Sequence, residues 1–430
     1  MDTASPFMHT IDRLPIDIVR GEYSRLQDSD GNWYLDFWGD EGVASLGYAT
    51  PWVQGVFREF ADNALALPHR LPDAYPNQLR TRAATALCKA AGFDQAFFCN
   101  SGAEANEAAI KLARRYWQKV RGSEHHSRIN VLTIEGNFHG RSGYSLAASD
   151  SIDSPYHKEG FGPSPRGFGI IGDDLDTSRI RIWDNTQERY VQASTYLQTE
   201  SPFHDWSKCA AVIMAPILGN NTVRTYPVSF WNHLDSLRKQ HGFLLIFDEI
   251  QVATGRTGYF CAHHNPAVTH GVRPDIITIG KGIAAGLPAA MTLADNEVAR
   301  AFKPGVHFST FGASMLVCRM MEEVIGWLET YSPGVRAREE QFKRGFEVLK
   351  GHNLITEYDG AGVHWGFTPN WSLLGASGPE ITERARRYGL LMLTHRKQAP
   401  IRFTPPVIVG ATELADGFTR LHQTLASFIG

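Results

Sequence analysis

The chain has 430 residues, of which 43% are hydrophobic and 20% charged, a composition typical of a globular enzyme and sufficient for two domains with a sizeable core. Its net charge of −3 gives no general attraction to nucleic acid or to an anionic membrane, and no apolar run approaches the roughly 20 residues that span a bilayer. The N-terminal stretch lacks the pattern of a secretory signal, and the five cysteines form no CxxC pair. We therefore expect free thiols and a cytoplasmic protein.

Three patterns of apolar and polar residues follow one another along the chain. Residues 21–39 alternate apolar and polar positions around a turn at Asp30-Gly31, which predicts a β-hairpin. From about residue 80 to 300, short apolar strands are separated by amphipathic helices, such as the one predicted over 103–120. After about residue 310 the pattern is helical again, with short strand-like pieces near the C-terminus.

The predicted strands of the middle region are apolar at almost every position instead of alternating: 95–100, 130–136, 210–217, 243–250 and 275–283. Such strands are buried on both faces, so we predict an α/β fold with a mainly parallel central sheet and helices on both faces. We place this large domain at residues 61–310. A smaller α+β domain is expected from both chain ends, with residues 1–60 as its N-terminal contribution and 311–430 as its C-terminal part.

In open α/β sheets the functional site lies outside the carboxyl ends of the strands. Four groups of residues stand at these ends: Ser101-Gly102-Ala103 at a helix start, Phe138 with His139 and Arg141 among glycines, Asp248-Glu249 with Gln251, and Lys281 between Gly280 and Gly282. Small residues at a helix start let backbone N–H groups point at an anion such as phosphate. A lysine that follows a buried strand is desolvated, which favours its neutral, nucleophilic form.

The apolar strand that ends in Asp248-Glu249 also resembles a Walker B strand, which would bind magnesium in an ATPase. A P-loop is absent, however, because the only Gly-Lys pair, Gly280-Lys281, is followed by Gly282 and has Asp275 where the first glycine belongs. The glycines near Lys281 miss the dinucleotide-binding pattern by one residue. HExxH, GxSxG and paired-cysteine zinc spacings are absent as well, and we expect no metal site.

Pyridoxal phosphate fits all four strand ends. This cofactor needs a lysine for its Schiff base, a phosphate cradle at a helix start, an aromatic face over its ring and a carboxylate for its ring nitrogen. The chain also resembles the class III (ornithine- and 4-aminobutyrate-type) aminotransferases. The blocks "NSGAEANEAAIKLARRY", "GNFHGRS", "FDEIQVATGRTGYF", "DIITIGKGIAAGLP", "STFGAS" and "IRFTPP" occur in the order of that family. The resemblance implies fold type I and a homodimer with sites at the subunit interface.

The resemblance also implies roles for individual residues. Lys281 is expected to form the Schiff base and Asp248 to pair with the pyridine nitrogen. The remaining expected cofactor contacts are Gln251 to the ring hydroxyl, Phe138 on the ring face, Ser101, Gly102 and Ala103 around the phosphate, and Thr310 at the phosphate of the neighbouring subunit. The candidate substrate-binding residues are Arg402 for an α-carboxylate, Arg141 for a distal carboxylate, and Trp38. Glu249 and Arg256 are expected to be structural.

One block departs from the family. Relatives commonly have Glu-Pro-x-Gln-Gly-Glu where this chain has Ala215-Pro-Ile-Leu-Gly-Asn220. In such relatives the second glutamate pairs with the carboxylate-binding arginine while an ω-amine is bound. Because Asn220 carries no charge, we expect Arg402 to stay open to carboxylates. The block "TFGAS" also departs from the usual Gly-Gly-Asn-Pro, which leaves the size of the site entrance open.

The most direct interpretation is an aminotransferase that acts on a primary amine or amino acid and a keto acid or aldehyde. Dialkylglycine decarboxylases also lack the second glutamate, so a decarboxylase is an alternative, as is a racemase or epimerase. A catalytically idle binding protein on the same fold is a further alternative. The conjunction of Lys281, Asp248, Gln251 and Thr310 argues against an idle protein, because a desolvated lysine and carboxylate have no use without chemistry.

Overall fold

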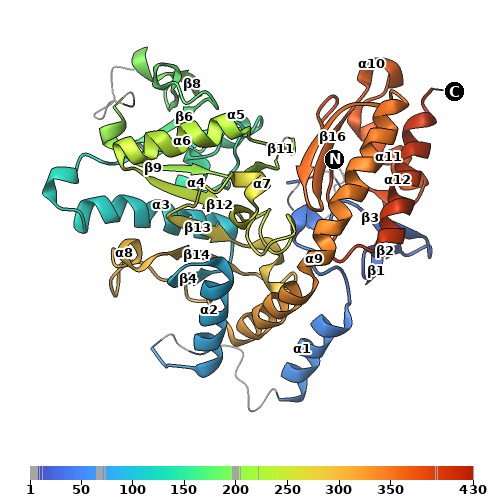
Figure 1. Cartoon of the computed structure of the whole chain (residues 1–430), viewed down its shortest axis with the longest axis horizontal. Helices are drawn as coiled ribbons and strands as arrows, with labels where there is room; N and C mark the ends of the chain where they lie inside the picture. The colour runs from blue at the N-terminus through green and yellow to red at the C-terminus, as the bar shows by residue number, and fades with distance from the viewer. Residues whose placement is uncertain are drawn as a thin grey trace.

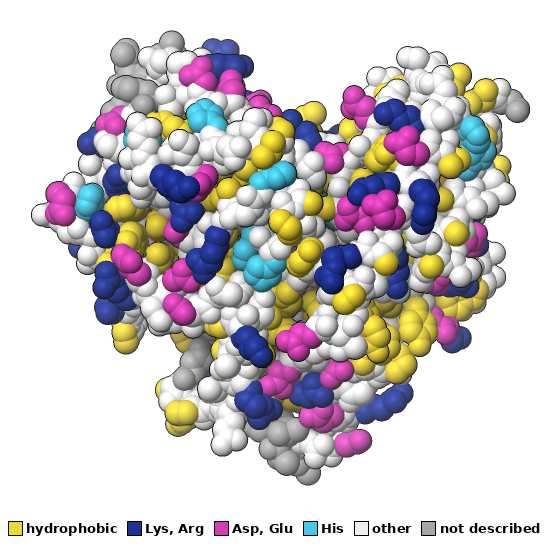
Figure 2. Space-filling model, in the orientation of Figure 1, with side chains coloured by type: hydrophobic (Ala, Val, Ile, Leu, Met, Phe, Trp, Pro, Cys, Tyr) yellow, Lys and Arg dark blue, Asp and Glu magenta, His cyan; other side chains and the backbone are white. Residues whose placement is uncertain are grey.

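The computed structural model describes residues 8, 10, 11, 13–63, 71, 74–195, 203, 205–220, 222–392, 394 and 396–429. These residues form a large lobe around a central sheet and a smaller lobe that contains segments from both chain ends (Figure 1). On the face in Figure 2, a notch separates the two lobes at one edge, and basic and acidic side chains are intermixed instead of gathered by sign. None of the helices within these residues is both long and apolar enough to cross a membrane.

The large lobe holds a nine-stranded sheet in the described part of the chain. Its strands, in spatial order, are β4 (Gln95–Cys99), β14 (Ala290–Ala294), β13 (Ile276–Ile279), β12 (Leu244–Asp248), β9 (Cys209–Met214), β5 (Asn130–Ile134), β6 (Phe168–Ile171), β7 (Arg181–Asp184) and β8 (Arg189–Gln192). Strands β13, β12, β9, β5 and β6 run parallel to one another. Strands β14, β7 and β8 pair antiparallel with their neighbours. The mainly parallel sheet is therefore confirmed, with antiparallel strands added towards both edges.

Both faces of this sheet are covered by helices, as the wholly apolar strands predict. Successive residues of β5 point to opposite sides, so that Val131 and Leu132 belong to different apolar clusters. One cluster includes side chains of α3 (Gly102–Lys119), α4 (Gly143–Ala147) and α8 (Asn296–Ala299). The other includes side chains of α2 (Gln78–Ala91), α6 (Val228–His241) and α9 (Met315–Gly351).

Helix α3 shows how the sequence determines this packing. Its N-cap is Ser101, whose hydroxyl accepts a hydrogen bond from the Glu104 N–H at 3.3 Å. Along its buried face, Ala105, Ala108 and Ala109 are fully buried, so the small side chains let the helix backbone approach the sheet closely. The helix therefore begins at the carboxyl end of β4 with its free N–H groups directed away from the core.

Within the described residues, the smaller lobe contains two sheets. One consists of β1 (Ile18–Glu22), β2 (Arg25–Asp28), β3 (Trp33–Asp36) and β17 (Leu390–Leu391), and the other of β15 (Ile355–Ala361), β16 (His364–Pro369) and β18 (Ile401–Phe403). Strands β2 and β3 form the predicted hairpin around Gly31, which has a φ of 87°. Because β17 pairs with β3, segments from the two ends of the chain lie side by side (Figure 1).

Helices α11 (Gly378–Arg387) and α12 (Ala411–Ala426) pack beside the sheets of the smaller lobe (Figure 1). The remaining short elements are α1 (Pro51–Asp62), α5 (Ser154–Lys158), β10 (Ile217–Leu218), β11 (Arg224–Thr225), α7 (Pro266–Thr269) and α10 (Trp371–Leu374). Helix α9 extends from the large lobe into the smaller one (Figure 1), which links the two cores through a single continuous element.

Candidate active site

The site is built where neighbouring strands of the large sheet end. Asp248 is the last residue of β12, and Lys281 follows β13 after a single glycine. These two strands are parallel and adjacent, with Asp248 opposite Thr278, so their carboxyl ends meet at the same edge of the sheet. The loop after β5, with Phe138 and His139, lies at this edge too, because β5 runs parallel to β9 and β9 to β12. The start of α3 lies there as well, since β4 precedes it and runs in the same direction as β13, with the antiparallel β14 between them.

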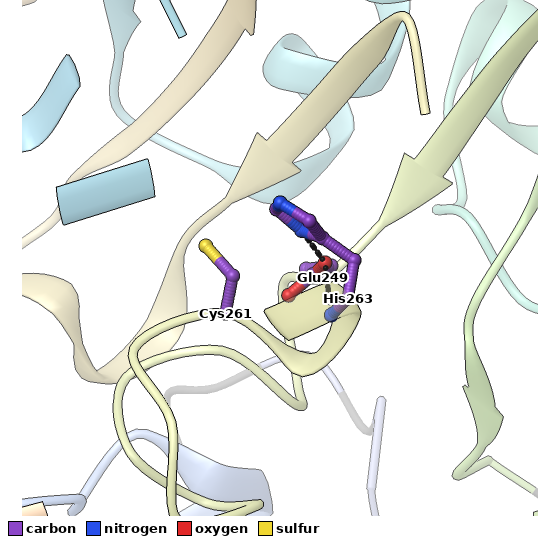
Figure 3. Close-up of side chains that lie close together, drawn as sticks. All are labelled: Glu249, Cys261 and His263. Carbon is purple, nitrogen blue, oxygen red and sulfur yellow. Dashed lines mark hydrogen bonds and ion pairs between the residues drawn. The ribbon is translucent and has the colours of Figure 1, made fainter. Parts of the chain in front are cut away.

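Glu249, next to Asp248, is directed away from this site. Its carboxylate accepts hydrogen bonds from the Nδ1 of His263 at 2.6 Å and from the backbone N–H of the same residue (Figure 3). The backbone N–H of Ala262 donates to it as well. The thiol of Cys261 lies close by, and the three side chains offer ligand atoms within 4.8 Å of one another. Because these N–H groups already satisfy the buried carboxylate, its contacts support the structural role expected for Glu249.

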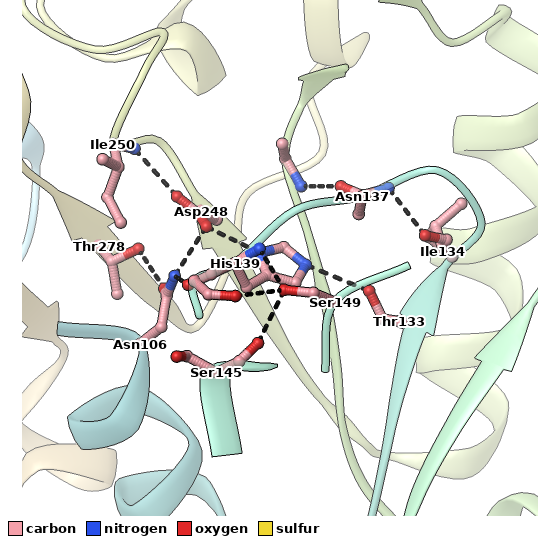
Figure 4. A network of polar contacts seen from close by, with 12 residues as sticks. Asn106, Thr133, Ile134, Asn137, His139, Ser145, Ser149, Asp248, Ile250 and Thr278 are labelled. Atoms are coloured by element: carbon pink, nitrogen blue, oxygen red, sulfur yellow. Dashed lines mark hydrogen bonds and ion pairs between the residues drawn. The ribbon is translucent and has the colours of Figure 1, made fainter. Parts of the chain in front are cut away.

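Asp248 is held by a network of donors (Figure 4). The carboxylate is only 6% exposed, and its Oδ2 accepts hydrogen bonds from His139 Nδ1 at 2.7 Å and from Asn106 Nδ2 at 2.8 Å. Its Oδ1 accepts from the backbone N–H of Ile250 at 3.1 Å. The hydroxyl of Thr278 donates to Asn106 Oδ1 at 2.8 Å and so orients the amide. These donors stabilise the ionised carboxylate and fix its direction.

His139 and Asn106 hold the candidate residue Asp248, a contact that the sequence does not predict. A single histidine among glycines has no specific signature. His139 is 2% exposed, and its Nε2 lies 3.1 Å from Thr133 Oγ1, so the ring is held at both nitrogens. Asn106 lies inside the predicted helix, where nothing in the local pattern distinguishes it from a surface amide.

Lys281 has a strained backbone and a perturbed side chain. Its φ of 48° is in the left-handed region, and its Nζ donates to the backbone carbonyl of Glu41 at 2.8 Å. Burial lowers the pKa of Lys281 to about 8, although the carboxylates of Glu41 and Asp248 raise it in part. The amine is therefore substantially neutral near pH 8, as a nucleophilic lysine requires.

Close approaches of backbone to side chains shape the rest of the site. A Cβ on Gly102 would lie 2.7 Å from Ile250 Cδ1, and a Cβ on Gly219 would lie 1.9 Å from Gln251 Oε1. A larger residue at either position would have to displace the side chain of Ile250 or Gln251. Gln251 Nε2 donates to the carbonyl of Glu41 at 3.1 Å, so Gln251 and Lys281 share one acceptor.

The remaining predicted residues lie nearer the surface. The guanidinium of Arg141 lies 5.0 Å from the ring centre of Phe138, with Phe138 half-buried and Arg141 exposed. Thr310 is exposed between Phe308 and Phe311, which are themselves 64% and 67% exposed. Trp38 is half-buried, and its Nε1 donates to Glu41 Oε1 at 3.3 Å.

The expectation of an open Arg402 is wrong. Its guanidinium forms a two-pronged ion pair with Glu41, in which Nη2 donates to Oε1 at 2.7 Å and Nη1 donates to Oε2. Nη1 also donates to the carbonyl of Gly219 at 3.3 Å. Asn220 brings no charge to Arg402, but Glu41 supplies one, although it lies 361 residues from Arg402 in the sequence. Burial raises the pKa of Glu41, yet Arg402, Lys281 and Trp38 outweigh it and hold this pKa at about 2.

Comparison with known proteins agrees with this geometry. A model of the aminotransferase class-III family matches residues 7–425. The chain belongs to the class III aminotransferases. The succinylornithine transaminase of Yersinia pseudotuberculosis is 33% identical over 94% of this chain and 91% of that protein. The acetylornithine aminotransferase of Vibrio vulnificus is 30% identical over 99% of this chain and 96% of that protein.

Solved structures show the same fold. An ornithine aminotransferase from Toxoplasma gondii superposes with a TM-score of 0.82 at 24% identity, covering 97% of this chain and 92% of that one. Another structure of the Toxoplasma gondii enzyme, with a TM-score of 0.80 at 25% identity over 97% and 91% of the two chains, is described as having partial occupancy of pyridoxal phosphate at its active site. This class III aminotransferase is therefore a pyridoxal-phosphate-dependent enzyme of fold type I.

The residues of the site fit this cofactor. The start of the 18-residue helix α3 favours an anion such as phosphate through the helix dipole. Asp248 presents a fixed negative charge, as a protonated ring nitrogen requires, and Lys281 presents an amine with a lowered pKa. The start of α3, Asp248 and Lys281 thus each match the chemistry of the cofactor group that they would face: the phosphate, the ring nitrogen and the aldehyde.

Proposed function

We propose that Lys281 carries pyridoxal phosphate covalently and that Asp248 pairs with its ring nitrogen. The further cofactor contacts in this proposal are Gln251 at the ring hydroxyl, Phe138 on the ring face, Ser101, Gly102 and Ala103 around the phosphate, and Thr310 at the phosphate in the neighbouring subunit. One observation supports this assignment above all others. A lysine with a lowered pKa and a carboxylate fixed by His139 and Asn106 follow adjacent parallel strands at the same sheet edge.

Each of these side chains has a defined task in amino-group transfer. Pyridoxal phosphate, when bound, supplies an electron sink for the electron pair left on the substrate carbon. Asp248 keeps the ring nitrogen protonated through its negative charge, and His139 keeps that charge in place. Once its amine is free of the cofactor, Lys281 would take up at Nζ the proton that leaves the substrate carbon and release it again, a task for which a pKa of about 8 is well matched.

For the substrates, we propose an amino acid as donor and a keto acid as acceptor. The named relatives act on acetylornithine and succinylornithine, which suggests a donor with a carboxylate distant from the reacting amine. Arg141, exposed beside Phe138, is our candidate for binding such a distal carboxylate. Arg402 is the candidate for the α-carboxylate of the keto acid, and Trp38 lines the same corner through its contact with Glu41.

We also propose that the enzyme is a homodimer in the cytoplasm. Phe308 and Phe311 expose large apolar rings on either side of Thr310, which is the arrangement expected of a surface that a second subunit covers. All five cysteines are free and buried, which fits a reducing compartment. A nucleic-acid partner is not part of the proposal, because the net charge is −3 and both signs of charge are intermixed in Figure 2.

A single-turnover experiment tests the reaction type. The holoenzyme is mixed with a panel of amino acids that includes acetylornithine and succinylornithine, and keto acid or aldehyde, carbon dioxide and the aminated cofactor are assayed in one tube. We expect carbonyl product and aminated cofactor in equal amounts without carbon dioxide. Release of carbon dioxide in step with turnover would instead show a decarboxylase. Lys281→Ala is the control, and it should abolish both turnover and the borohydride-reducible link to the cofactor.

A further inference from the structure

Glu41 places two different groups in the active site. Its carboxylate accepts two hydrogen bonds from the guanidinium of Arg402. Such a two-point interaction is stronger and more specific in direction than a single hydrogen bond. Its backbone carbonyl accepts hydrogen bonds from Lys281 Nζ at 2.8 Å and from Gln251 Nε2 at 3.1 Å. One residue from the smaller lobe thus contacts both the candidate carboxylate-binding residue and the residues expected at the cofactor.

The backbone around Glu41 is held in place. Residues 39–42 all have positive φ, with values of 64°, 48°, 57° and 99°. A Cβ on Gly39 would lie 2.5 Å from the carbonyl oxygen of Thr404, so this turn packs tightly against the strand end that carries Arg402. Glu41 itself adopts a left-handed conformation that is unfavourable for a residue with a side chain, so the surrounding contacts must hold it there.

The side chains of the pair differ in accessibility. Arg402 is 14% exposed and Glu41 is 41% exposed. A guanidinium that is so buried is unfavourable without an anion beside it, whether that anion belongs to the protein or to a ligand. Glu41 can turn towards solvent about its own side-chain bonds, whereas Arg402 is also anchored to the carbonyl of Gly219. Of the two, the carboxylate is the partner that moves when a ligand arrives.

We infer that Glu41 is a specificity-determining residue whose carboxylate occupies the anion site of Arg402 and competes with the carboxylate of a ligand. A ligand with a carboxylate at this position binds by displacing Glu41 into solvent. A ligand with apolar atoms there leaves the ion pair closed and meets no unpaired charge. The inference rests on the proposed function, because it assumes that substrates react at Lys281 beside this pair.

The test compares carboxylate affinity in three holoenzymes: the parent, Glu41→Gln and Asp40→Asn. Valerate, a monocarboxylate without an amino group, is titrated calorimetrically at pH 7.5. Glu41→Gln keeps the size of the side chain but removes the competing charge, so valerate should bind at least about tenfold more tightly. Asp40→Asn makes the same change in net charge one residue away, and Arg402 contacts Glu41 and Gly219 but not Asp40.

A gain in affinity is an outcome that loss of folding does not produce. Valerate affinity in Glu41→Gln within about twofold of the parent would overturn the inference, and so would an equal gain in Asp40→Asn. Adding Arg402→Ala to Glu41→Gln should remove the gain, which assigns it to this arginine. The ratio of kcat/KM for norvaline over pentylamine should also rise about tenfold or more in Glu41→Gln.

This experiment separates the inference from the proposed function. If the parent transfers no amino group in single turnover but Glu41→Gln still binds valerate more tightly, the proposed reaction is wrong and the competition at Arg402 stands. If the parent is an active aminotransferase and the valerate affinity does not change, the competition is wrong and the proposed reaction stands.

Discussion

Asp248→Asn is the substitution that examines the central charge of the site most directly. The carboxylate accepts three hydrogen bonds, from His139 and Asn106 at Oδ2 and from the backbone of Ile250 at Oδ1. Asparagine keeps the shape but has only one oxygen, which will face His139 and Asn106 because this orientation loses one contact instead of two. The N–H of Ile250 then faces another donor, and an unsatisfied buried donor costs about 1–3 kcal/mol of stability.

The effect on catalysis should be larger than the effect on stability. Loss of a central electrostatic contact in an active site raises the barrier by about 2.7–4 kcal/mol, which corresponds to a 10²–10³-fold decrease in kcat. The assay is single-turnover transfer of the amino group, with the bound cofactor quantified by absorbance so that loss of cofactor is not mistaken for loss of rate. We expect the cofactor to remain bound, because Lys281 and the helix start are unchanged.

Asp275→Asn provides a matched control. Asp275 also accepts hydrogen bonds from a backbone N–H, that of Leu245 at 2.7 Å, and from a side chain, that of Arg238. It precedes β13, so it lies at the opposite edge of the sheet from Asp248. We expect this variant to lose stability but to keep its rate. If Asp248→Asn retains activity within about tenfold of the parent, a difference of only about 1.4 kcal/mol, then Asp248 does not hold the ring nitrogen.

Further predictions concern the lysine, the subunit contact and the altered block. Between the lowered pKa of Lys281, about 8, and the ordinary lysine value near 10.4, the unfolded chain binds the extra proton. The measured quantity is the difference in the free energy of unfolding between the cofactor-free parent and Lys281→Met, obtained by urea titration. This difference should rise in favour of the parent from pH 8 to pH 10 and stay level below pH 7. A difference that does not change with pH would contradict the lowered pKa of Lys281. Phe311→Asp places a charge on the exposed apolar surface and should give monomers in sedimentation velocity, whereas Tyr331→Asp, an exposed aromatic elsewhere, should not. Asn220→Glu alone should change valerate affinity less than about threefold, because Glu41 already pairs with Arg402. In the Glu41→Gln background, Asn220→Glu should weaken valerate binding, since it restores a charge beside Arg402. If Asn220→Glu has the same effect on valerate affinity in both backgrounds, the two residues do not share this arginine.

Local sequence pattern was sufficient for the parts of this molecule that depend on neighbouring residues. The apolar strands around Asp248 and Lys281 predicted a buried parallel sheet because a strand covered on both faces has no polar alternation. The position of both residues at strand ends then placed them on one edge of that sheet. Strands β6, β14, β7 and β8 were not predicted; of these, β7 and β8, at one edge of the sheet, are short and only partly buried. The division of the chain at residues 60 and 310 stays a prediction.

The donors around Asp248 show a different limit. His139 and Asn106 reach the same carboxylate oxygen from a loop and from a helix, at sequence separations of 109 and 142 residues. Neither residue type is unusual in its own segment, so no local signal identifies it. Their role follows only from the strand pairing of the whole sheet. The parallel strands bring the loop after β5 to the end of β12, and the antiparallel pairs of β14 with β4 and β13 bring the start of α3 there.

The ion pair between Glu41 and Arg402 explains why the argument from Asn220 failed. An uncharged residue at the position where relatives carry a glutamate does not by itself leave the arginine without a partner. A buried guanidinium needs an anion, but the need does not specify which segment supplies it. Here the hairpin strand β3 leads into the turn at residues 39–42, and the pairing of β16 with β18 brings Arg402 to the same corner. The absence of a charge at position 220 therefore does not show whether Arg402 is paired. That conclusion also requires the other charged residues that the fold brings within reach of Arg402.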